Sequence, residues 1–402
     1  MRLNDHADRV EINENGLLQG DGGMKFFWQF LLVSFGLICF AEQGMADISV
    51  REEKLSLPIR MGSKTEQMET LIVRPVDGEK FPLVLIVNGS AGSTPSKMHA
   101  DWLASIAHDF AHRGYIAASV VWLGYGHSTG TFVENGGNCS KPTVSKFLDT
   151  RGNQLEAALN ALHAREDVDP SVTLGLGISI GGASMLDLAG RSNRPLTAVI
   201  NLSGGVYHSN TVIVPASNCS LYQNDLVRNF TNFGRNNPTP TLWVYAENDP
   251  YFGPKLVQRM LAGYRSQGGQ VDFAGLPPFE KNGHTLFKSE ATVLIKPRLD
   301  DFLRRNHLPA MNEDELAPLL SSLTASGRAN AELYIKNTTE KALAIADETK
   351  VMYWHYGART IEEARQEVLA YCQKESVKAC RVIAENSRLI DGWRDVVLGS
   401  SQ

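Results

Sequence analysis

Short runs of β-branched and aliphatic residues alternate with longer amphipathic stretches between residues 81 and 305. The short runs predict buried strands. The longer stretches carry apolar residues three and four positions apart, which predicts helices. This rhythm is typical of a mostly parallel sheet covered by helices on both faces. We expect strands at 82–87, 115–122, 172–176, 198–202, 241–245 and 271–274, and helices at 101–113, 154–165, 256–264 and 287–305.

The first of these helices should bury one face, because Trp102, Leu103, Ile106, Phe110 and Ala111 recur at helical spacing. Before the alternating unit, residues 48–76 predict antiparallel strands. Two stretches rich in Asn, Gly, Ser and Thr, 130–146 and 204–240, are predicted to be long loops. Each follows a predicted strand, so both should emerge at the carboxyl edge of the sheet, where open α/β folds bind ligands.

The character of the chain changes beyond His307. Residues 313–323 predict a linking helix, and Thr360 to Glu363 form a capping box that opens another helix. Expected strands at 342–346, 351–356 and 380–384 complete a small ββαβ module, which weakly resembles the cysteine-bearing modules appended to secreted bacterial proteins. The predicted organisation is a leader at 1–46, a catalytic domain at 47–308, a linker at 309–330 and a small α+β domain at 331–402.

An uncharged, mostly apolar run at 26–40 follows Met24 and Lys25, with small residues at Gly44 and Ala46. It predicts a secretory signal cleaved after Ala46. The run is short for a membrane span, so a retained anchor is the weaker alternative. We therefore expect an exported protein, periplasmic or extracellular, with no stable membrane span after cleavage.

Cleavage after residue 46 would remove Cys39 and leave four cysteines. In an exported protein an even number favours disulfides. Proximity in the sequence pairs Cys372 with Cys380, which leaves Cys139 with Cys219. Four buried thiols are the alternative.

Composition excludes several classes of function. With 39 basic and 44 acidic residues, the net charge of -5 lacks the basic footprint of a nucleic-acid binder. No cysteine pair has the spacing of a zinc site, and no HExxH occurs. Four further histidines fall in predicted helices without acidic partners at ligand spacing, so we expect no metal and no cofactor: His99, His108, His112 and His163.

The sequence Gly-Ile-Ser-Ile-Gly at 177–181 follows a predicted strand and precedes a helix that starts with small residues. This is the context of a nucleophile elbow, a turn so tight that glycines are needed two residues on either side of the serine. A dinucleotide-binding turn is the alternative. That fingerprint needs glycine or alanine where the chain has Ile180, and the next strand ends without an acidic ribose partner.

Partners for Ser179 follow in the required order. Asp249 comes after the strand at 241–245, and His284 comes after the strand at 271–274. Strand ends of a parallel sheet meet at one edge, so the three side chains are expected to form a catalytic triad. Glu247 is an alternative acid, although it more simply ends its strand. His127 lies after another strand, and we favour a turn or packing role for it over contact with substrate.

With these motifs, residues from about 48 to 307 resemble the α/β-hydrolase superfamily, and its dienelactone-hydrolase-like branch in particular. The resemblance implies an oxyanion hole made by the amides of Ile180 and Ser90, the latter in the turn Asn88-Gly89-Ser90. Dienelactone hydrolases themselves use a cysteine nucleophile, so Ser179 points to an ester hydrolase instead. The resulting hypothesis is an exported serine hydrolase acting on a small-molecule ester. A secreted peptidase of related fold and a noncatalytic binding protein are the alternatives.

Overall fold

The computed structural model describes residues 48–398, except 134–135, 192, 194, 208–218, 348 and 377–378. The predicted leader at 1–46 lies outside the described residues. Within the described part of the chain, no helix is both long enough and apolar enough to cross a membrane.

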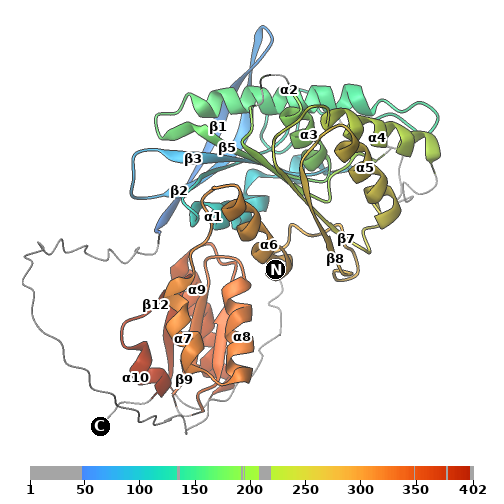
Figure 1. The fold of residues 1–402 in the computed structure, drawn as a ribbon. Helices are drawn as coiled ribbons and strands as arrows, with labels where there is room; N and C mark the ends of the chain where they lie inside the picture. Colours follow the sequence, from blue (N-terminus) through green and yellow to red (C-terminus); the bar gives the residue numbers. More distant parts are fainter. Residues whose placement is uncertain are drawn as a thin grey trace, which may run out of the picture.

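The larger unit is built on an eight-stranded sheet with the order β1-β2-β4-β3-β5-β6-β7-β8 (Figure 1). β1 and β2 form an antiparallel hairpin, β2 pairs antiparallel with β4, and every later pair is parallel. The strands are β1 (Val50–Met61), β2 (Lys64–Pro75), β3 (Phe81–Val87), β4 (Ile116–Val120), β5 (Val168–Ile178), β6 (Ala198–Leu202), β7 (Thr241–Ala246) and β8 (Val271–Leu276).

Helices cover both faces of this sheet (Figure 1). One face carries α1 (Ala104–Ala111) and α6 (Thr292–Arg305), and the other carries α2 (Val144–His163), α3 (Ile180–Ala189), α4 (Ser220–Phe233) and α5 (Pro254–Ser266). Short 3-10 turns lie at η1 (Pro95–Lys97), η2 (Ala100–Leu103) and η4 (Ser289–Ala291). The central strands β3 to β7 are buried on both sides apart from the exposed start of β5, as a sheet between two helix layers requires. This topology is the α/β-hydrolase fold, and the predicted fold class is confirmed.

Three local predictions were wrong. α4 occupies part of the predicted loop 204–240, and it buries Tyr222, Leu226 and Phe230 at a four-residue spacing that the surrounding polar residues concealed. α2 begins at Val144, inside the predicted loop 130–146. Trp102 is not on a buried helix face: it lies in the 3-10 turn before α1, with 57% of its surface exposed.

The smaller unit has an antiparallel sheet of order β10-β9-β11-β12 between two layers of helices. β9 is buried on both faces: Ala342, Ala344 and Ala346 pack toward α9, and Leu343 and Ile345 pack in the opposite core. The strands are β9 (Ala342–Ala346), β10 (Met352–His355), β11 (Cys380–Glu385) and β12 (Arg388–Leu389), and the helices are η5 (Asp314–Leu316), α7 (Ala317–Ser322), α8 (Ala325–Lys336), α9 (Ile361–Glu375) and α10 (Trp393–Leu398).

The expected ββαβ order is present in β9, β10, α9 and β11, whereas α8, α10 and β12 were not predicted. α9 begins at the expected cap, because the Thr360 hydroxyl accepts a hydrogen bond from the Glu363 amide at 3.1 Å.

The two units meet where α1 and α6 contact the segment 337–341, which is buried throughout. Beside this contact Arg113 forms two hydrogen bonds to the Asp300 carboxylate, at 2.7 and 3.1 Å. Burial alone would raise the pKa of Asp300, but the Arg113 guanidinium outweighs it and holds that pKa below its ordinary value of 3.8. Across the interface itself, the Thr339 amide donates to the buried Asp109 carboxylate at 2.7 Å, so the two units share a buried polar interface.

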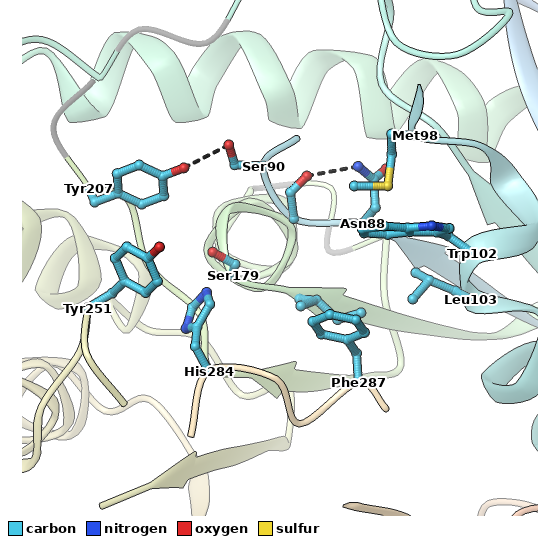
Figure 2. A pocket seen from close by; sticks show the side chains of 12 residues that line it. Asn88, Ser90, Met98, Trp102, Leu103, Ser179, Tyr207, Tyr251, His284 and Phe287 are labelled. Atoms are coloured by element: carbon cyan, nitrogen blue, oxygen red, sulfur yellow. Dashed lines mark hydrogen bonds between the residues drawn. The ribbon is translucent and has the colours of Figure 1, made fainter. Parts of the chain in front are cut away.

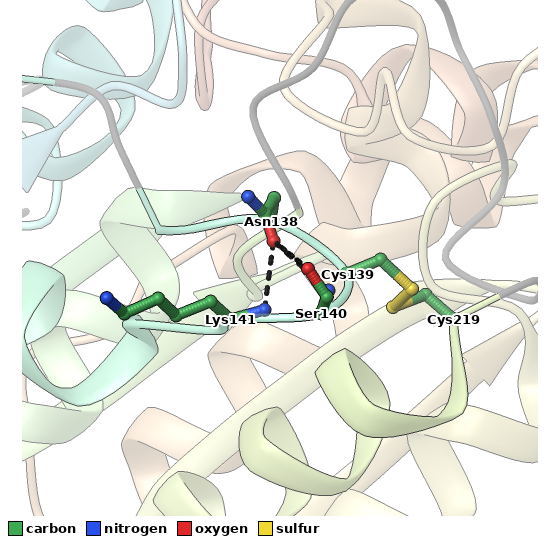
Figure 3. Close-up of a disulfide and its surroundings, with 5 residues drawn as sticks. All are labelled: Asn138, Cys139, Ser140, Lys141 and Cys219. Carbon is green, nitrogen blue, oxygen red and sulfur yellow. Dashed lines mark hydrogen bonds between the residues drawn. A yellow bond between two sulfur atoms is a disulfide. The ribbon is translucent and has the colours of Figure 1, made fainter.

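Two disulfides are present, with the pairs expected from the sequence. Cys139 lies in a tight turn and bonds to Cys219 at the start of α4, across a sequence separation of 80 (Figure 3). The turn is held by Asn138, whose side-chain oxygen accepts hydrogen bonds from the backbone and hydroxyl of Ser140 and from the Lys141 amide (Figure 3). The second disulfide joins Cys372 in α9 to Cys380 in β11.

Candidate active site

Ser179 occupies the turn between β5 and α3. Its backbone has φ 55° and ψ -120°, a conformation that L-residues avoid. Two backbone hydrogen bonds hold Ser179 in this conformation. The Ser179 amide donates to Leu202 O at 2.9 Å, and the Ser179 carbonyl accepts from the Gly205 amide at 3.0 Å. A strained serine between strand and helix is the geometry expected for a nucleophile elbow.

The flanking glycines are required by close approach. A Cβ on Gly177 would lie 2.3 Å from the backbone of Gly181, and a Cβ on Gly181 would lie 2.7 Å from the carbonyl oxygen of Asn88. Both distances are too short for any side chain, so the turn can only close with glycine at these positions. The closeness to Asn88 also places the end of β3 directly against the first turn of α3.

Asp249 and His284 are joined at the ends of neighbouring strands. The His284 Nδ1 lies 2.8 Å from Asp249 Oδ2, and the Asp249 side chain is fully buried. The other carboxylate oxygen accepts hydrogen bonds from the amides of Tyr251 at 2.8 Å and Phe252 at 3.0 Å. Because the carboxylate is saturated by donors, it fixes the ring so that Nδ1 carries the proton and Nε2 is free to accept one.

Ser179 and His284 line one pocket of about 170 Å³ (Figure 2). In Figure 2 the Ser179 hydroxyl and the His284 ring point toward one another. Ser179 is 3% exposed, and its hydroxyl has no hydrogen-bond partner among the described residues. The loop after β3 lies close on the other side, since a Cβ on Gly89 would be 3.0 Å from Ser179 Cβ. The pocket wall is completed by Met98, Trp102, Leu103, Ile178 and Phe287.

The two residues predicted to supply the oxyanion hole both lie close to Ser179. Ile180 is the first residue of α3, where amides have no acceptor inside the helix and favour negative charge. Ser90 lines the same pocket, and its loop is held by the Ser90 hydroxyl, which accepts from the Gly92 amide at 3.0 Å and from the Tyr207 hydroxyl at 2.7 Å (Figure 2). Where this loop leaves β3, the Asn88 carbonyl oxygen accepts a hydrogen bond from the Trp122 indole at 3.0 Å.

The sequence did not indicate the two tyrosines in this pocket. The Tyr207 and Tyr251 rings are 5.1 Å apart, and Tyr251 packs edge-on against His284 at 4.6 Å. Burial, with a further contribution from nearby Asp249, raises the pKa of Tyr251, so its hydroxyl stays neutral. Both tyrosines lie in loops that follow strands. Such loops often hold functional residues, but no sequence pattern marks which of their residues do so.

Other candidate residues lie elsewhere. Glu247 is exposed, and its amide continues the sheet by donating to Leu276 O, while His284 is paired with Asp249. His127 does not line the pocket. Its amide and ring instead contact the carboxylate of Glu69, whose pKa is lowered because hydrogen bonds from Ala100, His127 and His99 outweigh burial.

Two helix histidines have an acidic partner that the sequence spacing could not reveal. His108 and His112 have none at ligand spacing in the sequence, but the fold brings the distant Glu340 to both. Within the described residues two groups have the side chains and closeness to hold a metal ion, namely Glu69 with His99 and His127, and His108 with His112 and Glu340. Neither group belongs to the pocket that contains Ser179.

No family model matches the chain, and no curated protein matches it. Solved structures do match. A dienelactone hydrolase, described as putative, from Klebsiella pneumoniae is 16% identical, with 57% of this chain and 86% of that one covered and a TM-score of 0.40. An esterase from Pyrococcus furiosus is 13% identical, with coverage of 65% and 91% and a TM-score of 0.45. A lidless α/β serine hydrolase from Xanthomonas campestris is 17% identical, with coverage of 65% and 97% and a TM-score of 0.43.

Proposed function

We propose that this protein is an exported serine hydrolase that cleaves carboxylic esters through an acyl-enzyme. The observation that carries the proposal is the shared pocket of Ser179 and His284, with the imidazole oriented by the buried carboxylate of Asp249. A strained serine, a free ring nitrogen and a buried acid in this order are the parts that nucleophilic acyl transfer needs.

The reaction assigns a role to each group. Ser179 Oγ attacks the ester carbonyl while His284 Nε2 removes its proton, and Asp249 stabilises the imidazolium that forms. The negative oxygen of the tetrahedral intermediate is stabilised by the amides of Ile180 and Ser90. Collapse expels the alcohol, which takes the proton from His284. Water then attacks the acyl-enzyme by the same route and releases the acid.

The pocket also limits the acyl group. Its volume of about 170 Å³ is close to that of an apolar protein cavity known to bind benzene, about 150 Å³. Its apolar wall includes Trp102 and Phe287, whose rings are stacked at 6.1 Å. We therefore propose that short aliphatic or single-ring aromatic acyl groups are favoured over long chains.

The test is covalent labelling followed by a substrate series. A fluorophosphonate should attach to Ser179 in the wild type and in the control Ser171→Ala, which changes an exposed serine of β5, and should not attach in Ser179→Ala. Among p-nitrophenyl esters, the butyrate and benzoate should be hydrolysed faster than the palmitate. A folded wild type that takes no label would refute the catalytic proposal and favour the noncatalytic alternative. Labelling without ester hydrolysis, together with peptide cleavage, would favour the peptidase.

Export is supported by the two disulfides, which persist in oxidising compartments. The protein isolated after export should begin at residue 47, and thiol titration of the denatured, unreduced form should find none free. A retained residue 1 or free thiols would contradict this part of the proposal.

A further inference from the structure

A buried cluster of two histidines and a glutamate joins the two units of the fold, far from the pocket in the sequence. His108 lies on α1, and His112, four residues later, caps its C-terminal end with helical backbone angles, so both side chains lie on one face. Glu340 comes from the segment before β9. Its Oε1 is 3.1 Å from His108 Nδ1 and 2.7 Å from His112 Nε2. The three residues are 4%, 8% and 4% exposed.

The protons on His108 present a problem of charge. Its Nδ1 faces Glu340, and its Nε2 faces Glu52 Oε1 at 2.8 Å, so each ring nitrogen meets a carboxylate oxygen. A neutral imidazole has one N–H and one lone pair. In a neutral His108, one ring nitrogen would therefore point its lone pair at a carboxylate oxygen, which is unfavourable unless a cation lies between the two atoms. The cation is either a second proton on His108 or a metal ion.

The arrangement around the cluster favours the metal. The ligand atoms of the three side chains all lie within 4.8 Å of one another, so one ion between them would bind both histidines and the carboxylate at once. Glu52 is the partner that a ligating histidine usually has, a carboxylate that accepts from its other ring nitrogen. Glu52 is fixed in turn by Arg359 Nη2, at 2.6 Å.

The backbone also holds Glu340 in place. Its φ is 52°, a left-handed conformation that costs free energy for a residue other than glycine. Next to it, the buried Lys341 Nζ donates to three carbonyl oxygens, those of residues 334, 335 and 337, which fixes the segment. The carboxylate is thus positioned before any ion binds, as a preorganised ligand requires.

We propose that His108 Nδ1, His112 Nε2 and the Glu340 carboxylate bind one Zn²⁺ ion that links the smaller unit to the larger unit. Two imidazoles and a carboxylate suit zinc, whereas calcium and magnesium prefer oxygen ligands alone. The oxygen-to-nitrogen distances of 2.7 and 3.1 Å are hydrogen-bond lengths. Tetrahedral zinc at 2.0–2.1 Å from its ligands would need an edge of about 3.3 Å, so the side chains would separate by a few tenths of an ångström as the ion replaces the shared protons. A water molecule would complete the fourth position.

The second histidine cluster differs in these respects and provides a control. There the Glu69 carboxylate already accepts from the amides of Ala100 at 3.0 Å and His127 at 2.6 Å, and the His127 side chain is 80% exposed. Because that carboxylate already accepts hydrogen bonds from the loop backbone, we expect no zinc ion at Glu69. Substitution of His127 should therefore leave zinc binding unchanged.

The experiment uses tag-free purified protein stripped with a chelator. Zn²⁺ is titrated by calorimetry, and Co²⁺ by the visible absorption of a tetrahedral site. We expect one ion per chain in the wild type, in Ser179→Ala and in His127→Ala. Glu52→Gln should weaken binding about 10–100-fold, and Glu340→Gln and His112→Ala should weaken it more. Because Ser179→Ala lacks the proposed nucleophile, its result separates this proposal from the catalytic one.

Two results would overturn the proposal. One is a folded wild type that binds neither ion at micromolar concentration, which would mean that protons alone link the cluster. The other is unchanged affinity in folded Glu340→Gln or His112→Ala. If these variants do not fold, wild-type crystals soaked in Zn²⁺ decide: an anomalous peak between the three side chains supports the site, and no peak there refutes it.

Discussion

The two disulfides close loops of very different length, and this difference predicts their separate contributions to stability. The Cys139–Cys219 pair is separated by 80 residues and the Cys372–Cys380 pair by 8. Cross-linking stabilises mainly by restricting the unfolded chain, with an entropy that grows with the logarithm of loop length. The chain-entropy relation gives about 4.5 kcal/mol for the long loop and about 2.5 kcal/mol for the short one at 25 °C.

The two bridges also lie in different cores. Cys219 belongs to the core of the larger unit, and Cys372 and Cys380 belong to the core between α9 and β9 in the smaller unit. The suitable perturbation is replacement of each pair by alanine, because serine would bury hydroxyl groups without partners. Removing Cys139–Cys219 should destabilise the larger unit, and removing Cys372–Cys380 should destabilise the smaller unit by about 2 kcal/mol less.

Urea unfolding without reductant, followed by fluorescence and circular dichroism, measures both effects. Each transition is fitted separately, because two cores need not unfold together. The free energy of unfolding is compared with that of the wild type under the same conditions. If removal of the short loop costs as much as removal of the long one, the loop-entropy reasoning is refuted and strain or local packing decides instead.

Three other predictions concern single side chains. Tyr207→Phe removes the hydroxyl that donates to Ser90, and it should lower kcat for ester hydrolysis about 2–10-fold while the protein stays folded; an unchanged kcat would mean that this bond does not position the loop. Asp249→Asn should lower kcat about 10⁴-fold by permitting the wrong tautomer of the histidine, and a loss below tenfold would contradict the triad. Asp300→Asn breaks the buried pair with Arg113 and should cost about 3–5 kcal/mol at neutral pH in urea unfolding. The folded pKa of Asp300 is lowered, so its stabilisation is complete above the ordinary pKa of 3.8 and is lost as the pH falls through the lower folded value; a difference from wild type that persists in strong acid would refute this assignment.

The parts of the fold predicted from the sequence are those in which pattern and burial agree. β3 is a continuous apolar run, and β6 is apolar except for Asn201, because both faces of the sheet are covered; the sequence reveals such runs directly. α4 was missed because its buried stripe lies within a polar segment and little more than one residue per turn carries the signal. Trp102 was misplaced because a 3-10 turn shifts the register of the side chains that precede α1.

In the candidate site too, some residues could be predicted from a local sequence pattern and others could not. Ser179 and its glycines carry a local signal, since strain demands particular residues at particular positions. The pairing of His284 with Asp249 could be expected from strand order alone. Tyr207 and Glu340 carry no local signal, because each acquires its neighbours only when distant segments fold together: Glu340 lies 228 residues after His112. Sequence patterns indicate helices, strands and turns. Contacts between distant segments, such as those of Tyr207 and Glu340, leave no such pattern.

The exposed indole of Trp102 gives the protein an optical reporter. Trp122 and Trp243 are fully buried and Trp393 is 7% exposed, whereas Trp102 is 57% exposed and forms part of the pocket wall beside Phe287. A soluble quencher will therefore reach Trp102 before these three. A ligand in the pocket of Ser179→Ala will cover that indole, so binding can be followed by loss of quenching without any chemical label and without turnover.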